Sequence, residues 1–327
     1  MKYFALAIVS SVICGVTACG GSGGGGSAAP TAPTATTTST TNAMTGGTAN
    51  SVCHPSVTEA TQTPDFAIEI IPAGDPLYGL FYKCTKVFGL QLLAIQSYPD
   101  APMLQTATIA AEYLDNNEDG VVDNSAVNSQ LQSSGSGIWL GEDAPGGNAE
   151  PPHVTDIQTR GAAQIAYMQH RVDIFVDAIK GGTYCGSACG EINDTAIEHV
   201  PEIIQKGGYV LAYPSDFGPY AGTTLANAMD TARGGYWASN PVSYPASAWY
   251  TGEGLPYDGH MIEYFAWGLV TNLGLLGERS PNACAVFANE WTLCTKAEFQ
   301  ATDTKFLAIL NNSQFVLPTV APDGSYR

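Results

Sequence analysis

Apolar side chains recur at helical spacing through much of this chain. Between residues 103 and 114 they fall at Leu104, Ala107, Ala111 and Leu114, so that one face of a helix is apolar. Similar spacing predicts helices in six further ranges: 126–132, 160–179, 195–206, 225–233, 259–276 and 295–310. The range 259–276 is apolar on nearly all sides, which is typical of a buried helix.

Strand-like patterns are few, and the best of them are 67–71 and 137–140. The pattern therefore predicts a mainly α protein with a small β part, of the α+β class. In the helix at 195–206, Asn193 or Asp194 is expected as the N-cap and Gly207-Gly208 as the end. Pro201 lies near enough to the start of this helix to be tolerated with some kinking.

The first 18 residues have the features of a secretory signal peptide. A short charged start precedes an apolar run that ends in Val16-Thr17-Ala18-Cys19, and the run is too short to span a membrane. The residues before Cys19 resemble the bacterial lipobox, which implies that Cys19 is lipidated and anchors the chain to a membrane. Gly20 then favours the outer membrane of the cell envelope. An ordinary signal peptide with an incidental cysteine is the alternative.

Residues 19–52 are mostly Gly, Ser, Thr, Ala and Pro, which predicts a flexible tether behind the lipidated cysteine. No later break in composition divides the rest, so 53–327 is expected to form a single globular domain. Without Lys2, the exported chain has 11 basic and 30 acidic residues, a net charge of −19. We therefore expect no nucleic-acid partner, since the basic footprint is missing, whereas cation binding fits this charge.

Six cysteines follow Cys19, and an even number behind an export signal indicates disulfides. Pairing each cysteine with its nearest neighbour gives Cys53–Cys84, Cys185–Cys189 and Cys284–Cys294. The sequence does not fix this connectivity, because six cysteines allow fifteen patterns. Cys185 and Cys189 are close enough to form a metal clip instead, although their spacing and the export context favour a disulfide.

An acidic loop follows the first predicted helix and has the spacing of an EF-hand. Oxygen side chains of Asp115, Asn117, Asp119 and Asp123 fall at loop positions 1, 3, 5 and 9, and the carbonyl of Val121 falls at position 7. Gly120 stands where the chain turns sharply, but Ala126 replaces the usual glutamate at position 12. We therefore expect weak structural calcium binding, with a dissociation constant of roughly 10⁻⁴–10⁻³ M. A solvated acidic turn is the alternative.

Two histidine–glutamate pairs offer a second kind of metal chemistry. His199 and Glu202 are three residues apart, as are His260 and Glu263, so each pair shares a helix face. Imidazole and carboxylate together suit zinc and similar transition ions. A single such pair is more often a surface hydrogen bond. Glu263 lies in an apolar stretch and requires a partner, for which a metal, a histidine or Arg233 would serve.

Several segments resemble a largely uncharacterised group of exported, zincin-like bacterial proteins that also carry a calcium-type loop. The similarity covers most of residues 70–326 and is carried by Glu198–Gly208, Ala212–Gly218, Ala228–Gly235, Tyr244–Tyr250, Glu263–Trp267, Leu317–Gly324 and the Asp115–Gly120 loop. The group often shows E-E-x-x-H on one helix and Glu-Tyr on a later one, a layout similar to that of zinc metallopeptidases. The resemblance implies a zincin-like helical core, here stapled by disulfides.

The resemblance also implies site residues. His199, Glu202 and Glu263 would hold zinc, with His260 as a fourth ligand or a supporting partner, and Glu198 would be the general base. Tyr264, Tyr250 or Arg233 would stabilise an oxyanion. This chain exchanges the histidine and glutamate at positions 199 and 202 relative to the group. Metal binding is compatible with this exchange, but the placement of a catalytic base is in doubt and a degenerate site is an alternative.

A non-catalytic surface module that binds calcium and a peptide or polysaccharide is the main competing interpretation. Aromatic residues lie between the two candidate site helices and would suit a ligand platform or ordinary packing: Tyr236, Trp237, Tyr244, Trp249, Tyr250 and Tyr257. A serine hydrolase is disfavoured because no G-x-S-x-G follows a strand.

Overall fold

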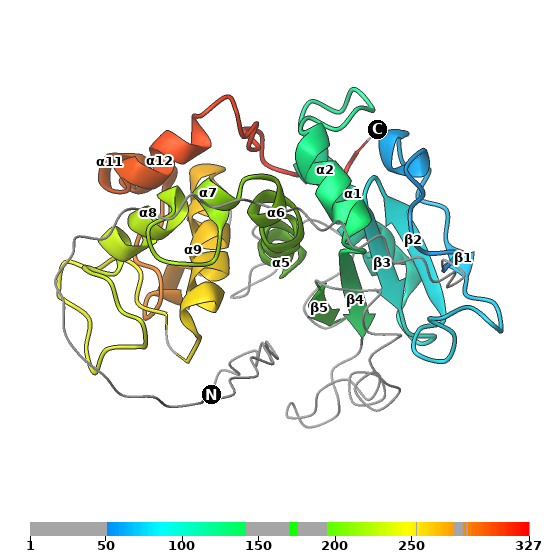
Figure 1. The fold of residues 1–327 in the computed structure, drawn as a ribbon, viewed down its shortest axis with the longest axis horizontal. Helices are drawn as coiled ribbons and strands as arrows, with labels where there is room; N and C mark the ends of the chain where they lie inside the picture. The colour runs from blue at the N-terminus through cyan, green and yellow to red at the C-terminus, as the bar shows by residue number, and fades with distance from the viewer. Residues whose placement is uncertain are drawn as a thin grey trace, which may run out of the picture.

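The computed structural model describes residues 51–141, 171–175, 195–252, 254–277, 284–285 and 287–326, and these form an α+β fold. A sheet occupies one side of the molecule, helices α8, α9, α11 and α12 occupy the other, and α5 lies between them (Figure 1). The predicted signal peptide, Cys19, Cys185 and Cys189 lie outside the described residues. So does the predicted tether, apart from Ser51, which is buried, and Val52.

The sheet has five strands in sequential order: β1 (Glu69–Ile70), β2 (Lys83–Val87), β3 (Leu90–Ala94), β4 (Gly137–Gly141) and β5 (Arg171–Phe175). The first three are antiparallel to one another, whereas β3, β4 and β5 run parallel. Every residue of β3 and β4 is buried. Alternation is absent from such strands because both faces are covered, which explains why the sequence pattern did not reveal β3.

The helix predicted over 160–179 is wrong where the structure describes it. Residues Arg171–Phe175 form strand β5, which pairs in parallel with β4, and the rest of the range lies outside the described residues. An apolar run of this kind fits either a buried strand or a buried helix, and pairing with β4 decides the outcome.

The predicted helices at 103–114, 126–132, 225–233 and 259–276 are confirmed. They are α1 (Asp100–Leu114), α2 (Ser125–Ser133), α8 (Thr224–Ala232) and α9 (Tyr257–Asn272). Two short helices, η1 (Glu59–Thr61) and α7 (Pro214–Phe217), were not predicted.

The single helix predicted at 295–310 is two helices, α11 (Lys296–Thr302) and α12 (Thr304–Leu310). Asp303 separates them, and its side chain accepts a hydrogen bond from the backbone N–H of Phe306 as the N-cap of α12. An aspartate that caps a new helix competes with continuing the old one, and the apolar periodicity does not show this.

The helix predicted at 195–206 is confirmed as α5 (Thr195–Ile204), but Gly207-Gly208 does not end it. The chain continues through a π-helical turn, η4 (Gln205–Tyr209), into α6 (Val210–Ala212). A Cβ atom on Gly207 would lie 2.0 Å from Ser136 Oγ, and one on Gly208 would lie 2.6 Å from Val127 Cγ1. The two glycines therefore allow this helix to pack closely against Val127 of α2 and against Ser136, which follows α2.

Pro201 is accommodated inside α5 by a hydrogen bond from another helix. A proline has no N–H, so the carbonyl of Ile197, four residues earlier, loses its usual helical donor. The hydroxyl of Tyr113 on α1 donates to that carbonyl at 2.9 Å. The buried carbonyl is therefore satisfied, and α5 stays in contact with α1.

Two disulfides are present among the described residues, Cys53–Cys84 and Cys284–Cys294. Both agree with nearest-neighbour pairing. After α12 the chain runs back across the molecule and ends beside α1 and α2 (Figure 1). No helix among the described residues has the length and apolar character needed to cross a membrane.

Candidate functional site

Helices α5 and α9 pack against each other and bring acidic side chains together in the middle of the molecule. Glu198, His199 and Glu202 lie on one turn of α5, and a ligand atom from each lies within 4.8 Å of the other two. Part of the predicted metal set is thus gathered in space. Glu263 on α9 lies outside this compact group but close enough to interact with it electrostatically.

Glu202 is the most buried member of the group, with 3 % of its surface exposed. Its Oε2 atom is 2.9 Å from His199 Nδ1, so the imidazole N–H donates to this oxygen. Among the described residues, no donor reaches the other oxygen, Oε1, which is also buried. Buried carboxylate oxygens are normally hydrogen-bonded or paired with a cation, so Oε1 marks a position suited to a cation.

Glu290, which the sequence analysis did not single out, belongs to the same group of charges. Burial raises the pKa of Glu263 well above its usual range, and the negative charges of Glu202, Glu198 and Glu290 raise it further. Burial also raises the pKa of Glu290. Glu290 lies in a short segment without regular periodicity, and its position three residues before Leu293 carries no motif. Only its place inside a disulfide-closed loop could have drawn attention to it.

The pKa of Glu198 is raised to about 7, chiefly by burial. The neighbouring His199 lowers it, whereas the charges of Glu202 and Glu290 raise it. The carboxyl group of Glu198 thus exchanges a proton near neutral pH in the absence of a bound cation.

His260 shares its helix face with Glu263 but has other partners. Its Nε2 lies 2.6 Å from Asn240 Oδ1, and its Nδ1 lies 3.1 Å from the hydroxyl of Tyr250. Because Asn240 Oδ1 only accepts, Nε2 carries the hydrogen and Nδ1 accepts from Tyr250. Burial and the charge of Arg233 lower the pKa of His260 to about 4, so the ring is neutral.

The proposed oxyanion donors also have partners. Tyr264 donates to Asp303 Oδ2 at 2.6 Å, and the fully buried Arg233 donates to the carbonyl of Trp237 and the hydroxyl of Tyr244. Tyr250 donates to the His260 backbone carbonyl at 3.0 Å as well as to its ring. Burial raises the pKa of Tyr250 well above its usual range, and the negative charges of Glu263 and Glu290 raise it further.

The acidic loop after α1 is closed by hydrogen bonds from its own backbone to its polar side chains. Asp115, which is fully buried, accepts from the Gly120 N–H at 2.8 Å. Asp119 accepts from the Val121 N–H at 2.9 Å, and Asp123 accepts from the Asn116 N–H at 2.7 Å. Asn117 accepts from the Asp119 N–H. The predicted ligand side chains therefore surround one small loop, with φ positive at Glu118 and Gly120.

An open depression of about 870 Å³ lies between α8 and α12. Polar side chains line most of it: Thr224, Asn227, Asp230, Thr231 and Lys305. Asp230 accepts from the hydroxyl of Tyr257, whose ring packs edge-on against exposed Tyr236 at 5.4 Å. Part of the predicted aromatic cluster therefore lies beside a polar depression, away from the α5 carboxylates.

No family model, curated protein or solved structure matches the chain. Its function is therefore inferred from the side chains described above.

Proposed function

We propose that the chain is a lipid-anchored metalloprotein of the bacterial cell envelope, with a zinc-binding hydrolase site between α5 and α9. The observation that carries this proposal is the buried Glu202 carboxylate, whose Oε1 atom has no donor among the described residues. Burying an anionic oxygen without a partner costs several kcal/mol, on the order seen for uncompensated buried charges, unless a cation balances it.

The orientation of His199 supports metal binding. A histidine that binds a metal commonly donates its other ring N–H to a carboxylate, which fixes the ring and its tautomer. His199 donates Nδ1–H to Glu202 Oε2 in this way. The lone pair of the neutral ring is then on Nε2, which faces away from Glu202, so His199 and Glu202 would bind one ion together only after this hydrogen bond gives way to coordination. His199, Glu202 and Glu263 would together supply one imidazole and two carboxylates, which are ligand types that zinc accepts, once Glu263 closes on the α5 group.

Hydrolysis is the chemistry that this ligand set favours, and the resemblance to zincin-like proteins points to a peptidase-like reaction. A zinc ion at this position would act as a Lewis acid and lower the pKa of a bound water to about 7. Glu198 adjoins this ligand set, and its pKa of about 7 suits a side chain that accepts and then releases a proton. Tyr250 would have to release His260 before its hydroxyl could stabilise developing negative charge.

Calcium at the loop after α1 would have a structural role in this proposal, with Asp115, Asn117, Asp119, Asp123 and the Val121 carbonyl as its ligands. The loop links α1, which packs on the sheet and on α5, to α2, which packs on the sheet and on η4, so an ion there would fix both helices. The lipidated Cys19 would hold the whole protein at the outer membrane.

The second candidate is a non-catalytic calcium-binding module whose ligand is a polysaccharide or a peptide. The specific observation that favours it is the polar depression between α8 and α12, with exposed Tyr236 beside it. Polar side chains next to an exposed aromatic ring are the features that bind a sugar.

Elemental analysis of the purified protein and of Glu202→Gln tests the zinc site. After dialysis against zinc and then against metal-free buffer, the wild type should retain one zinc per chain and Glu202→Gln should retain little. Glu69→Gln, which alters a carboxylate on the sheet paired with Lys86, is the matched control and should behave as the wild type. A wild type without zinc would rule out the hydrolase and leave the binding module.

A further inference from the structure

The open depression between α8 and α12 owes its shape to the way in which α8 ends. Gly234 has a φ of +74°, and the N–H of Gly235 donates to the carbonyl of Asp230 at 2.7 Å, the pattern of a glycine-capped helix end. Both glycines line the depression, and neither has a side chain to fill it. The turn therefore leaves an open space beside the last turn of α8, and Tyr236 follows it directly.

Two tyrosine rings lie beside this space and support each other. Tyr236 has 57 % of its surface exposed, and its ring packs edge-on against that of Tyr257 at 5.4 Å. The hydroxyl of Tyr257 lies 3.1 Å from each carboxylate oxygen of Asp230, which lines the depression. A supported aromatic ring with a free surface thus stands next to a carboxylate whose orientation is fixed.

The rest of the lining offers neutral donors and acceptors and one cation. Thr224, Asn227 and Thr231 on α8 and Lys305 on α12 are all exposed. Lys305 Nζ donates to Thr231 Oγ1 at 2.8 Å, which joins the two helices. An ammonium group has three N–H donors, so Lys305 is able to bind a ligand as well. With Asp230 and Lys305 as its charged members, the lining is balanced in charge.

These groups suit a sugar. The C–H face of a sugar ring packs on an aromatic ring, and its hydroxyls both donate to a carboxylate and accept from an ammonium group. Peptide recognition relies on apolar pockets or a strand edge, whereas Ala308 is the one apolar side chain among the described lining residues. The net charge of −18 disfavours an anionic polymer.

The size of the depression indicates more than one sugar unit. Its volume of about 870 Å³ lies in the upper part of the range of roughly 300–1,000 Å³ that is typical of ligand pockets. Because the depression is open rather than enclosed, a polymer is able to extend beyond it in both directions.

We propose that the depression between α8 and α12 binds a segment of a neutral polysaccharide, with Tyr236 as the stacking ring and with Asp230 and Lys305 as partners of the sugar hydroxyls. The proposal rests on the second candidate function and narrows its ligand to an uncharged sugar chain. It gives this site no part in zinc binding, because the lining residues do not belong to the α5 group.

Electrophoresis of the native protein through gels that contain a polysaccharide tests the site. We expect at least one of dextran, laminarin, xylan and mannan to retard the wild type. Tyr236→Ala should weaken that binding by about tenfold, as truncation of an aromatic anchor does. Tyr236→Phe keeps the ring and should stay within about twofold of the wild type. Tyr78→Ala, which removes a tyrosine of similar exposure (53 %) between β1 and β2, is the matched control and should bind as the wild type does.

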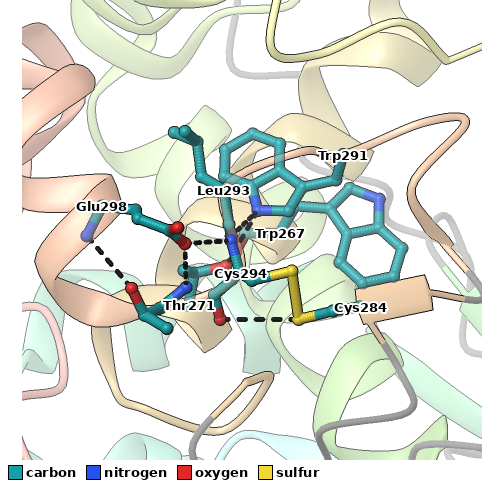
Figure 2. Close-up of a disulfide and its surroundings, with 8 residues drawn as sticks. Trp267, Thr271, Cys284, Trp291, Leu293, Cys294 and Glu298 are labelled. Atoms are coloured by element: carbon teal, nitrogen blue, oxygen red, sulfur yellow. Dashed lines mark hydrogen bonds between the residues drawn. A yellow bond between two sulfur atoms is a disulfide. The ribbon is translucent and has the colours of Figure 1, made fainter.

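Tryptophan fluorescence gives a second readout at the depression. Trp237 is half-buried and adjoins the stacking ring in sequence, whereas Trp267 and Trp291 are buried beside the Cys284–Cys294 disulfide (Figure 2). Acrylamide therefore quenches Trp237 more than these two. The polysaccharide that retards the wild type should reduce this quenching, and the protection should be absent from Trp237→Phe. Unchanged quenching with the polysaccharide bound would place the binding elsewhere and overturn the proposal.

Gels that contain gelatin or alginate separate the alternatives. Retardation by gelatin and by none of the neutral polysaccharides would overturn the sugar assignment and keep the binding module with a peptide ligand. Retardation by alginate alone would overturn the neutral character of the ligand. Equal retardation of the wild type and Tyr236→Ala would overturn the placement of the site. Retardation by none of these polymers would overturn the proposal and the second candidate function together.

Discussion

Glu202 and His260 are both buried ionisable side chains, and their surroundings satisfy them differently. His260 is neutral and has a hydrogen-bond partner at each ring nitrogen, so its burial needs nothing further. Glu202 has a partner at Oε2, and none among the described residues at Oε1. A buried carboxylate oxygen without a donor is the feature that makes Glu202 the stronger candidate ligand of the two. Sequence spacing alone made the two residues look equivalent.

The neutral state of His260 makes a prediction at the scale of one residue. Its pKa is about 4 in the folded protein and about 6.5 in the unfolded chain, so between these values the unfolded chain binds more protons. The free energy of unfolding contributed by this group therefore falls as the pH is lowered from 6.5 to 4. The free energy of unfolding of the wild type, measured relative to that of His260→Gln, should therefore fall by about 2–3 kcal/mol between pH 6.5 and pH 4.

Urea denaturation of both proteins between pH 4 and 9 measures this difference. Above pH 7.5 the ring is neutral in both states, so the gap in unfolding free energy should be constant there and serve as the baseline. A gap that also stays constant down to pH 4 would show that His260 titrates normally.

At the scale of elements, the positions of side chains along helices were predictable, whereas pairing and close approach were not. The periodicity of residues 103–114 and 259–276 gave α1 and α9, and hence the faces on which Glu263 and His260 lie. The parallel strand β5 and the division at Asp303 depend on tertiary contacts. The continuation of α5 past Gly207 also depends on tertiary contacts, because the absence of a Cβ atom at Gly207 leaves room for the Ser136 side chain.

Gly207 tests this explanation. In an open helix, alanine would be more stable than glycine by about 1 kcal/mol. Here a Cβ atom would approach Ser136 Oγ to 2.0 Å, so we expect Gly207→Ala to destabilise the protein by about 1–3 kcal/mol. In a Ser136→Ala background the oxygen is gone and the cost should shrink by about 1 kcal/mol. A double-mutant cycle measured by urea denaturation gives this coupling, and additive effects would contradict the contact.

At the scale of the whole molecule, the C-terminal segment joins the calcium-type loop to the rest of the fold. The side-chain oxygen of Asn116 accepts from the backbone N–H groups of Thr319 and Val320, both at 2.8 Å. Glu112 accepts from three consecutive N–H groups, those of residues 323–325. Tyr326 donates to Asp115 Oδ2 at 2.5 Å. Asp115, which stands at position 1 of the loop, therefore also accepts a hydrogen bond from the C-terminal segment.

Calcium should accordingly control the order of the chain end. Without the ion, Asp115, Asp119 and Asp123 lie in one small loop; burial raises the pKa of Asp123, and the charges of Asp115 and Asp119 raise it further. Repulsion among them loosens the loop and with it the bond from Tyr326 to Asp115.

Hydrogen exchange measured by mass spectrometry, with about 10 mM calcium chosen to exceed the expected dissociation constant and then with a chelator, tests this coupling. We expect amides of residues 319–325 to exchange about tenfold faster after chelation, a change in local opening free energy of about 1.4 kcal/mol. Amides of α9 should not change, because none of the hydrogen bonds found among the described residues of the loop involves that helix. Tyr326→Phe should expose the same tail amides even with calcium present, since it removes the bond to Asp115 and leaves every loop oxygen in place. If chelation leaves tail exchange unchanged, the loop is a solvated acidic turn and the contacts of residues 319–326 do not depend on calcium.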